Sequence, residues 1–181
     1  MTIQAEYSAE FQIDLLGLDV ENLPEPILDI GCGSTAALVR ELRRRGKTAF
    51  GLDRDVKEDP FLISADWFEY SLKAKSWGAV ISHQGLSNYF LECHLKSGVE
   101  AAKCAMKYME ILRSLKSGGV FCYAPGLPFI EEILSADKYR FVRMPIRDLP
   151  DGGPSEMELA RAYGKNPFYS CRVEVINPPV K

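Results

Sequence analysis

The feature that most constrains the fold is a regular alternation of short apolar runs with amphipathic stretches, from residue 27 to residue 176. The first run, Ile27–Ile30, ends at Gly31, and apolar residues at helical spacing follow it up to Gly46. Short runs beside glycine and proline are typical of buried strands, whereas the spacing that follows is typical of a helix. Further strands are predicted at residues 48–52, 61–65, 77–82, 120–124, 139–144 and 170–176.

Two of the intervening helices have recognisable starts. Ser97 and Glu100 have the spacing of a capping box, which predicts a helix over residues 98–116. Pro128 follows the fifth strand and suits the first position of another helix. Residues 84–97, between the fourth strand and the long helix, are predicted to form a loop.

Strands and helices that alternate in this order predict an α/β fold, with a mainly parallel, doubly wound sheet that has helices on both faces. The 181 residues, 46% of them apolar, suffice for one core but not for two full domains. We therefore expect a single domain over residues 1–181. It would include a helical N-terminal segment at 1–24 and an insert at 147–169, with a short helix after a capping box at Ser155 and Glu158.

The charge balance argues against two classes of partner. Lys and Arg number 22 against 25 Asp and Glu, so nothing favours binding to nucleic acid or to an anionic membrane. The N-terminus has no basic region before an apolar run, and no stretch approaches the roughly 18 apolar residues of a membrane span. We expect a cytoplasmic protein. Its five cysteines form no CxxC pair, so free thiols are expected rather than a disulfide framework or a zinc site.

Polar residues and glycines gather at the ends of the first four predicted strands. In a parallel sheet, ligands bind beyond the carboxyl ends of the strands, where the strand order reverses. Gly31 and Gly33 would let the chain turn sharply and let a ligand approach the main chain. Asp53 follows Gly33 at about the 20-residue spacing that brings a second-strand carboxylate to ribose hydroxyls. The strand-end residues are Asp29, Gly31, Gly33, Asp53, Asp66, Trp67, Ser82 and His83.

These motifs resemble those of class I methyltransferases, which use S-adenosyl-L-methionine as methyl donor. The resemblance rests on LDIGCG at residues 28–33, GLDRD at 51–55 and LKSGGVF at 115–121, and it covers roughly residues 25–125. It implies the Rossmann-like fold of that family, a seven-stranded sheet with an antiparallel last strand. It also implies an enzyme that transfers a methyl group by in-line displacement, to an acceptor that the sequence does not identify.

Carried over residue by residue, the resemblance implies a cofactor site at the strand ends. Asp29 would order the glycine loop and meet the ammonium end of the cofactor, and Asp53 would hold the ribose hydroxyls. The loop itself, Gly31, Cys32 and Gly33, would pack beside the methionine part.

The adenine end is implied to lie at the next strand ends. Arg54 would lie near the adenine face, and Asp66 would accept from the adenine amino group with Trp67 alongside. Ser82 is a further candidate cofactor contact. The sequence departs from the family pattern at two positions, where Thr35 replaces the third loop glycine and Gly78 replaces the acid that opens the fourth strand.

His83 is the candidate catalytic residue. Methyl transfer mainly requires donor and acceptor at attack distance, but an oxygen or protonated nitrogen acceptor needs a base for its proton. Alternatively, His83 packs and forms hydrogen bonds at the end of its strand. Residues 84–97 and the insert are the expected substrate walls, with candidate contacts at Asn88, Tyr89, Phe90, Arg147, Asp148 and Tyr163.

Two other functions remain open. GCGSTA also matches the GxGxxG/A fingerprint of an NAD(P)-binding oxidoreductase, although the carboxylate two residues before Gly31 and the ADW at residues 65–67 favour the methyl donor. The chain could also be a noncatalytic, cofactor-binding interaction domain. Because it carries no added recognition domain, we expect a small acceptor, or a homodimer or protein partner that completes the substrate site.

Overall fold

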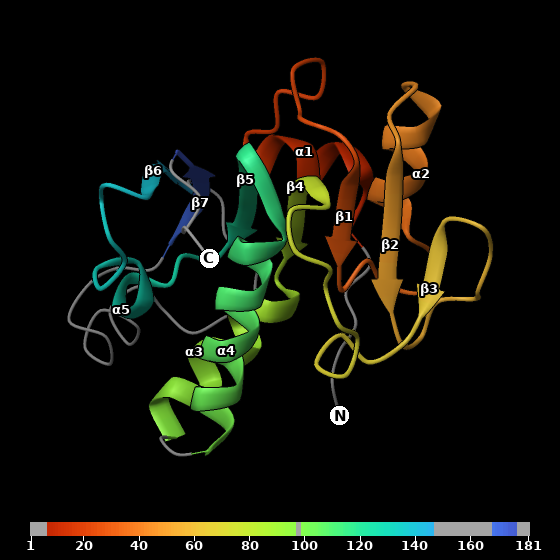
Figure 1. The fold of residues 1–181 in the computed structure, drawn as a ribbon. Helices are drawn as coiled ribbons and strands as arrows, with labels where there is room; N and C mark the ends of the chain where they lie inside the picture. Colours follow the sequence, from red (N-terminus) through yellow and green to blue (C-terminus); the bar gives the residue numbers. More distant parts are fainter. Residues whose placement is uncertain (1–6, 97–98, 147–167, 177–181) are drawn as a thin grey trace.

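The computed structural model describes residues 7–96, 99–146 and 168–176. Within these ranges, seven strands form one sheet in the order β3-β2-β1-β4-β5-β7-β6 (Figure 1). The strands are β1 (Ile27–Ile30), β2 (Ala49–Asp53), β3 (Leu62–Ser64), β4 (Trp77–His83), β5 (Leu115–Ala124), β6 (Tyr139–Pro145) and β7 (Tyr169–Val175). The helices are α1 (Ala9–Leu16), α2 (Ala37–Arg44), α3 (Gly85–Lys96), α4 (Val99–Ser114) and α5 (Pro128–Glu131).

The direction of the strands confirms the predicted fold class. β1 pairs in parallel with β2 and β4, and the pairs β2–β3 and β4–β5 are also parallel. β7 runs antiparallel to both β5 and β6. The sheet is therefore doubly wound and mainly parallel, with an antiparallel last strand. Its order reverses between β1 and β4, so the carboxyl ends of these strands flank the crevice where such folds bind ligands.

The core has two parts, because successive side chains of a strand point to opposite faces of the sheet. Ile27 packs with the buried residues of α1 and α2, such as Leu16 and Leu42. Leu28 packs on the other face with residues of α3 and α4, such as Phe90 and Tyr108. Helices thus cover both faces of the sheet, as Figure 1 shows.

The predicted loop at residues 84–97 is wrong, because Gly85–Lys96 is helix α3. Its start carries no local capping signal in the sequence. The backbone turns at Gln84, which has a φ of 58°, and the Leu86 amide donates to the Ser82 hydroxyl at 3.2 Å. The cap is therefore supplied from the end of β4.

The other predicted strands, and the helix at 98–116, are confirmed with shifts at their ends. The largest shift is in β5, which begins at Leu115 because this residue pairs with Trp77 of β4 before a register shift. β6 and β7 meet at Pro145 and Tyr169, beside the carboxyl end of β5. The described residues Ile146 and Phe168, which flank residues 147–167, therefore lie at the ligand end of the sheet, where the Ile146 amide donates to the Phe168 carbonyl at 3.1 Å.

Several residues singled out in the sequence lie outside the described ranges. They are Ser97, Arg147, Asp148, Ser155, Glu158 and Tyr163. The N-terminal segment contains α1, where the Ser8 side chain accepts from the Phe11 amide at 3.2 Å. Among the helices that are described, none is both long and apolar enough to cross a membrane.

Backbone crowding explains why position 78, the second residue of β4, holds a glycine and not an acid. A Cβ atom at this position would lie 2.5 Å from the Pro24 carbonyl carbon and 2.6 Å from the Glu25 carbonyl oxygen. The Gly78 amide also donates to the Pro26 carbonyl at 2.9 Å. The segment that leads into β1 therefore packs directly on β4 and leaves no room for a side chain.

We expect Gly78→Ala to lower the free energy of unfolding by about 2–3 kcal/mol, because the added methyl group meets main-chain atoms that cannot rotate away. Urea denaturation measures this change. Gly118→Ala is the control, since Gly118 has a φ of 72° and no atom lies within 4 Å of its added Cβ. That variant should lose only about 1 kcal/mol, from backbone strain alone. Equal losses in the two variants would contradict the crowding explanation.

Candidate functional site

The glycine loop after β1 is tied to the end of β2. Gly31 and Gly33 have φ values of 77° and 72°, which favour glycine. The Gly31 amide donates to the Leu52 carbonyl at 2.8 Å, and the Gly33 amide donates to Oδ2 of Asp53 at 3.0 Å. Oδ1 of Asp53 accepts from the Asp55 amide at 2.9 Å. One carboxylate therefore orders both the loop and its own turn.

The departure at Thr35 has a simple structural reason. The residue in the left-handed region is Ala36, with a φ of 49°, and not Thr35. The Thr35 carbonyl accepts from Nε of Arg40 at 3.0 Å, which ties this end of the loop to α2. Thr35 therefore does not need the conformational freedom of a glycine.

Asp29 lies beneath the loop and is only 2% exposed. Burial, and secondly the charge of Asp53, raise the pKa of its carboxyl to about 7. Burial also raises the pKa of the Cys32 thiol, helped by the charges of Asp29 and Asp53. The Cys32 sulfur packs against β2, because a Cβ at Gly51 would lie 2.7 Å from it. Cys32 therefore turns its side chain toward the sheet.

The start of α3 packs against the same loop. Ser82 is fully buried, and its hydroxyl donates to the Ile30 carbonyl at 2.9 Å and accepts from the Leu86 amide. A Cβ at Gly85 would lie 3.6 Å from the Gly31 Cα. Main-chain atoms thus engage the hydroxyl that was predicted to contact a cofactor. Gly85, which the sequence motifs do not single out, therefore lies at ordinary van der Waals distance from the loop.

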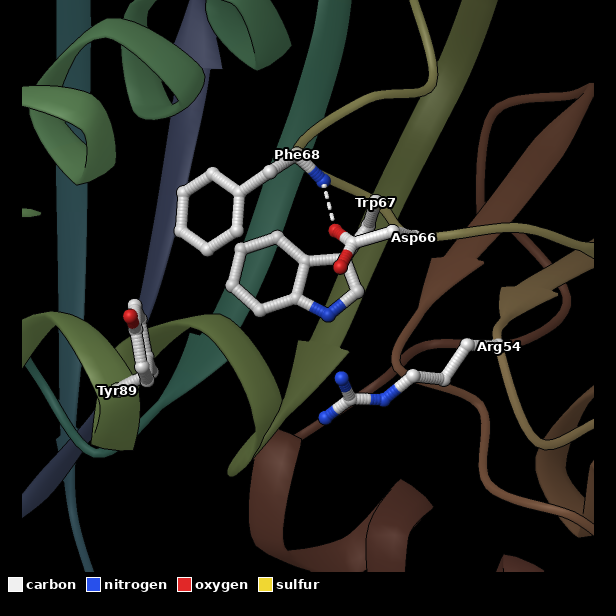
Figure 2. Close-up of a pocket in the computed structure, with 5 residues that line it drawn as sticks. All are labelled: Arg54, Asp66, Trp67, Phe68 and Tyr89. Atoms are coloured by element: carbon white, nitrogen blue, oxygen red, sulfur yellow. Dashed lines mark hydrogen bonds between the residues drawn. The ribbon is translucent and has the colours of Figure 1, made fainter.

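A pocket of about 130 Å³ lies at the ends of β2 and β3, and Arg54, Asp66, Trp67, Phe68 and Tyr89 line it (Figure 2). The Trp67 and Phe68 rings are stacked with centroids 4.1 Å apart. The Tyr89 ring stands edge-on to both, at 6.1 Å from Trp67 and 5.5 Å from Phe68. One oxygen of Asp66 accepts from the Phe68 amide at 2.8 Å. The pocket therefore combines aromatic faces with one carboxylate and one guanidinium.

The structure brings Arg54, Asp66 and Trp67 together as the sequence analysis expects. The sequence motifs do not identify Phe68, and they place Tyr89 in a substrate wall because they predict a loop where the structure has α3. Asp29 and Asp53 do not line this pocket. Asp53 and Asp66 are nevertheless neighbours, since Asp53 pairs with Ser64 in the sheet and its carbonyl accepts from the Ala65 amide at 3.3 Å.

His83, the last residue of β4, is buried under the N-terminal segment. Its side chain is 8% exposed, and the Tyr7 ring meets it edge-on at a centroid distance of 4.9 Å. Nε2 is buried and has no hydrogen-bond partner within the described residues. Burial lowers the pKa of the imidazole to about 4, so His83 is neutral at pH 7. No three His, Cys, Asp or Glu side chains in the described ranges gather into a metal site.

Comparison with known proteins gives matches at the level of structure. No family model and no curated protein matches the sequence. The N-methyltransferase NodS from Bradyrhizobium japonicum WM9, in complex with S-adenosyl-L-homocysteine, aligns with a TM-score of 0.59 and 14% identity over 94% of this chain and 87% of its own. Magnesium protoporphyrin IX methyltransferase from Synechocystis PCC 6803, with bound S-adenosyl-L-methionine, aligns with a TM-score of 0.56 and 15% identity. The alignment covers 92% of this chain and 76% of that chain.

A third structure is described as a complex between the Haloferax volcanii Trm112 methyltransferase activator and a methyltransferase. It aligns with a TM-score of 0.54 and 19% identity over 95% of this chain and 91% of that chain. Identities this low establish the fold alone. The chain has the class I methyltransferase fold, as the sequence motifs imply.

The raised pKa of Asp29 predicts a pH-dependent stability. Between about pH 4 and 7 the native carboxyl keeps a proton that the unfolded chain releases, so this residue makes the protein less stable as the pH rises. Asp29→Asn should remove that loss. We expect the stability difference between variant and wild type to shift in favour of the variant by about 2 kcal/mol from pH 5 to pH 8.

Urea denaturation at both pH values measures this shift in the absence of ligand. Glu58→Gln, at an exposed carboxylate in the loop after β2, is the control and should show no comparable shift. A difference for Asp29→Asn that stays constant between the two pH values would mean that Asp29 is already ionised at pH 5.

Proposed function

We propose that the protein is an S-adenosyl-L-methionine-dependent methyltransferase. The observation that carries the proposal is the arrangement at three neighbouring strand ends: a glycine loop over Asp29, Asp53 beside it, and the aromatic pocket with Asp66 next to Asp53. This order suits the successive parts of an adenosine-bearing amino acid. The fold that the chain shares with methyltransferases supports the same proposal.

The donor groups of this chain fit such a cofactor. Asp29 and the amides of the glycine loop would meet its amino acid end, and Asp53 would exchange one of its amide contacts for the ribose hydroxyls. The pocket is smaller than the roughly 300–1,000 Å³ of sites that enclose a whole ligand, so it would hold the adenine alone. There, Trp67 offers a stacking face and the second oxygen of Asp66 can accept from an amino group.

The bound cofactor would supply a methyl group already activated on a sulfonium. The remaining task of the chain is to hold the acceptor in line with it, which can contribute about 7–11 kcal/mol to lowering the barrier. The Ser82 hydroxyl, bonded to both the Ile30 carbonyl and the Leu86 amide, would keep the start of α3 against the loop. His83, neutral with an unpartnered Nε2, would take a proton from the acceptor.

The strand order disfavours the dehydrogenase alternative. The usual dinucleotide-binding fold has the parallel order 3-2-1-4-5-6, whereas here β7 is inserted antiparallel between β5 and β6. A noncatalytic domain would bind the cofactor without turnover. The acceptor is unidentified, and a homodimer or a protein partner could complete its site, as the neighbour in complex with an activator suggests. A cytoplasmic location stays a prediction.

Binding of S-adenosyl-L-homocysteine, measured by titration calorimetry, tests the cofactor assignment. Asp53→Ala should weaken binding by about 1.5–3 kcal/mol, because it removes hydrogen bonds to a charged group. Asp53→Asn, which keeps one acceptor for the Gly33 amide, should lose less. Glu58→Ala removes an exposed carboxylate from the same loop and should bind like the wild type. The proposal would be refuted if Asp53→Ala bound S-adenosyl-L-homocysteine as tightly as the wild type does. It would also be refuted if the wild type bound NADH and not S-adenosyl-L-homocysteine.

A further inference from the structure

The N-terminal segment builds an aromatic cover over His83. The Tyr7 and Phe11 rings stack with centroids 5.1 Å apart and planes at 18°. Both rings meet the imidazole edge-on, with centroids at 4.9 Å for Tyr7 and 6.0 Å for Phe11. Residues separated by more than 70 positions along the chain therefore form one cluster at the end of β4.

The cover is held in place by the start of α1. The Ser8 side chain accepts from the Phe11 amide at 3.2 Å, which caps the helix between the two rings. The Gln12 side chain is buried and donates from Nε2 to the Tyr7 carbonyl at 3.1 Å. The main chain on either side of the cover is thus fixed by hydrogen bonds, so the rings have a defined position over the imidazole.

We propose that Tyr7 and Phe11 are positioning residues that keep His83 an unprotonated base for an uncharged acceptor carrying an O–H or N–H group. This inference deepens the proposed function and rests on it for the acceptor.

Among the described residues, no acidic side chain forms an ion pair with the imidazole. β5 places Ala124 opposite His83, and Ser82 and Gln84 are its uncharged chain neighbours. The N-terminal segment faces it with Tyr7, while Glu10 and Asp14 of α1 are exposed. β1 contributes Asp29, which pairs with Ile81. Burial, and no neighbouring charge, accounts for the lowered pKa of the imidazole.

The unpartnered nitrogen indicates what the site receives. A buried polar atom is costly unless a hydrogen bond satisfies it, and Nε2 of His83 lacks one among the described residues. With the imidazole proton on Nδ1, Nε2 is an acceptor, so a hydroxyl or an N–H group would complete it. The apolar edges of Tyr7 and Phe11 favour an uncharged molecule over a carboxylate or an ammonium, because neither ion would regain its lost hydration there.

The transfer balances with these groups alone. The acceptor oxygen or nitrogen forms a bond to the methyl carbon while the bond from that carbon to sulfur breaks, and its electron pair stays on sulfur. The acceptor proton passes to Nε2 of His83. Because the imidazole holds a proton weakly in this site, it returns the proton to solvent at neutral pH and the base is regenerated.

NMR titration of the two histidines without cofactor tests the role of the cover, with His94→Gln to assign the signals. His83 should titrate with a midpoint near pH 4 in the wild type. In Tyr7→Ala/Phe11→Ala the midpoint should rise toward the ordinary value of about 6.5. Tyr7→Phe, which keeps the ring, should retain the low midpoint, and so should the control Leu15→Ala elsewhere on α1. A midpoint that is the same in the double alanine variant and the wild type overturns the role.

The acceptor class is tested by the His83 signals in protein saturated with S-adenosyl-L-homocysteine. Phenol should shift these signals, whereas benzoate and benzylammonium should not. A shift with either ion, or no shift with phenol, overturns the acceptor class. If S-adenosyl-L-homocysteine did not bind at all, the proposed function would be refuted. The titration without cofactor would still decide whether Tyr7 and Phe11 act on His83.

Discussion

A hydrogen bond of 3.0 Å from the Gly33 amide to the Asp53 carboxylate joins the two halves of the candidate site. It fixes the glycine loop at the end of β1 relative to the turn at the end of β2. The turn continues into Arg54, and the pairing of Asp53 with Ser64 brings Asp66 and Trp67 alongside. This hydrogen bond and the parallel pairing of β1, β2 and β3 together hold the loop and the aromatic pocket at one edge of the sheet.

Burial favours the uncharged form of two ionisable side chains in the site, Asp29 and His83. It raises the pKa of Asp29 to about 7 and lowers the pKa of His83 to about 4. A cation bound above Asp29 would favour its charged form again, so cofactor binding in the proposed function would release a proton from it. Nε2 of His83 has no hydrogen-bond partner among the described residues, and in our proposal the Tyr7 and Phe11 rings keep its imidazole neutral.

Local patterns predicted the strands and the glycine loop well, because apolar runs and glycine positions are properties of adjacent residues. Asp29, Gly31, Gly33 and Asp53 lie at the strand ends as expected, with Arg54, Asp66 and Trp67 in one pocket. The start of α3 was missed since its cap comes from Ser82, outside the usual capping pattern. With α3 taken for a loop, Tyr89 could not be assigned to the pocket.

The sequence by itself determined which residues end the strands and, through their alternation, that the sheet is mainly parallel. Three features were decided by the tertiary structure alone. The Ser82 hydroxyl forms its hydrogen bonds with main-chain atoms, and position 78 has no room for a side chain beside Pro24. The Tyr7 and Phe11 rings cover His83. Each depends on contacts between segments far apart in the chain. Such contacts leave no local pattern, because packing and desolvation arise only once the segments meet.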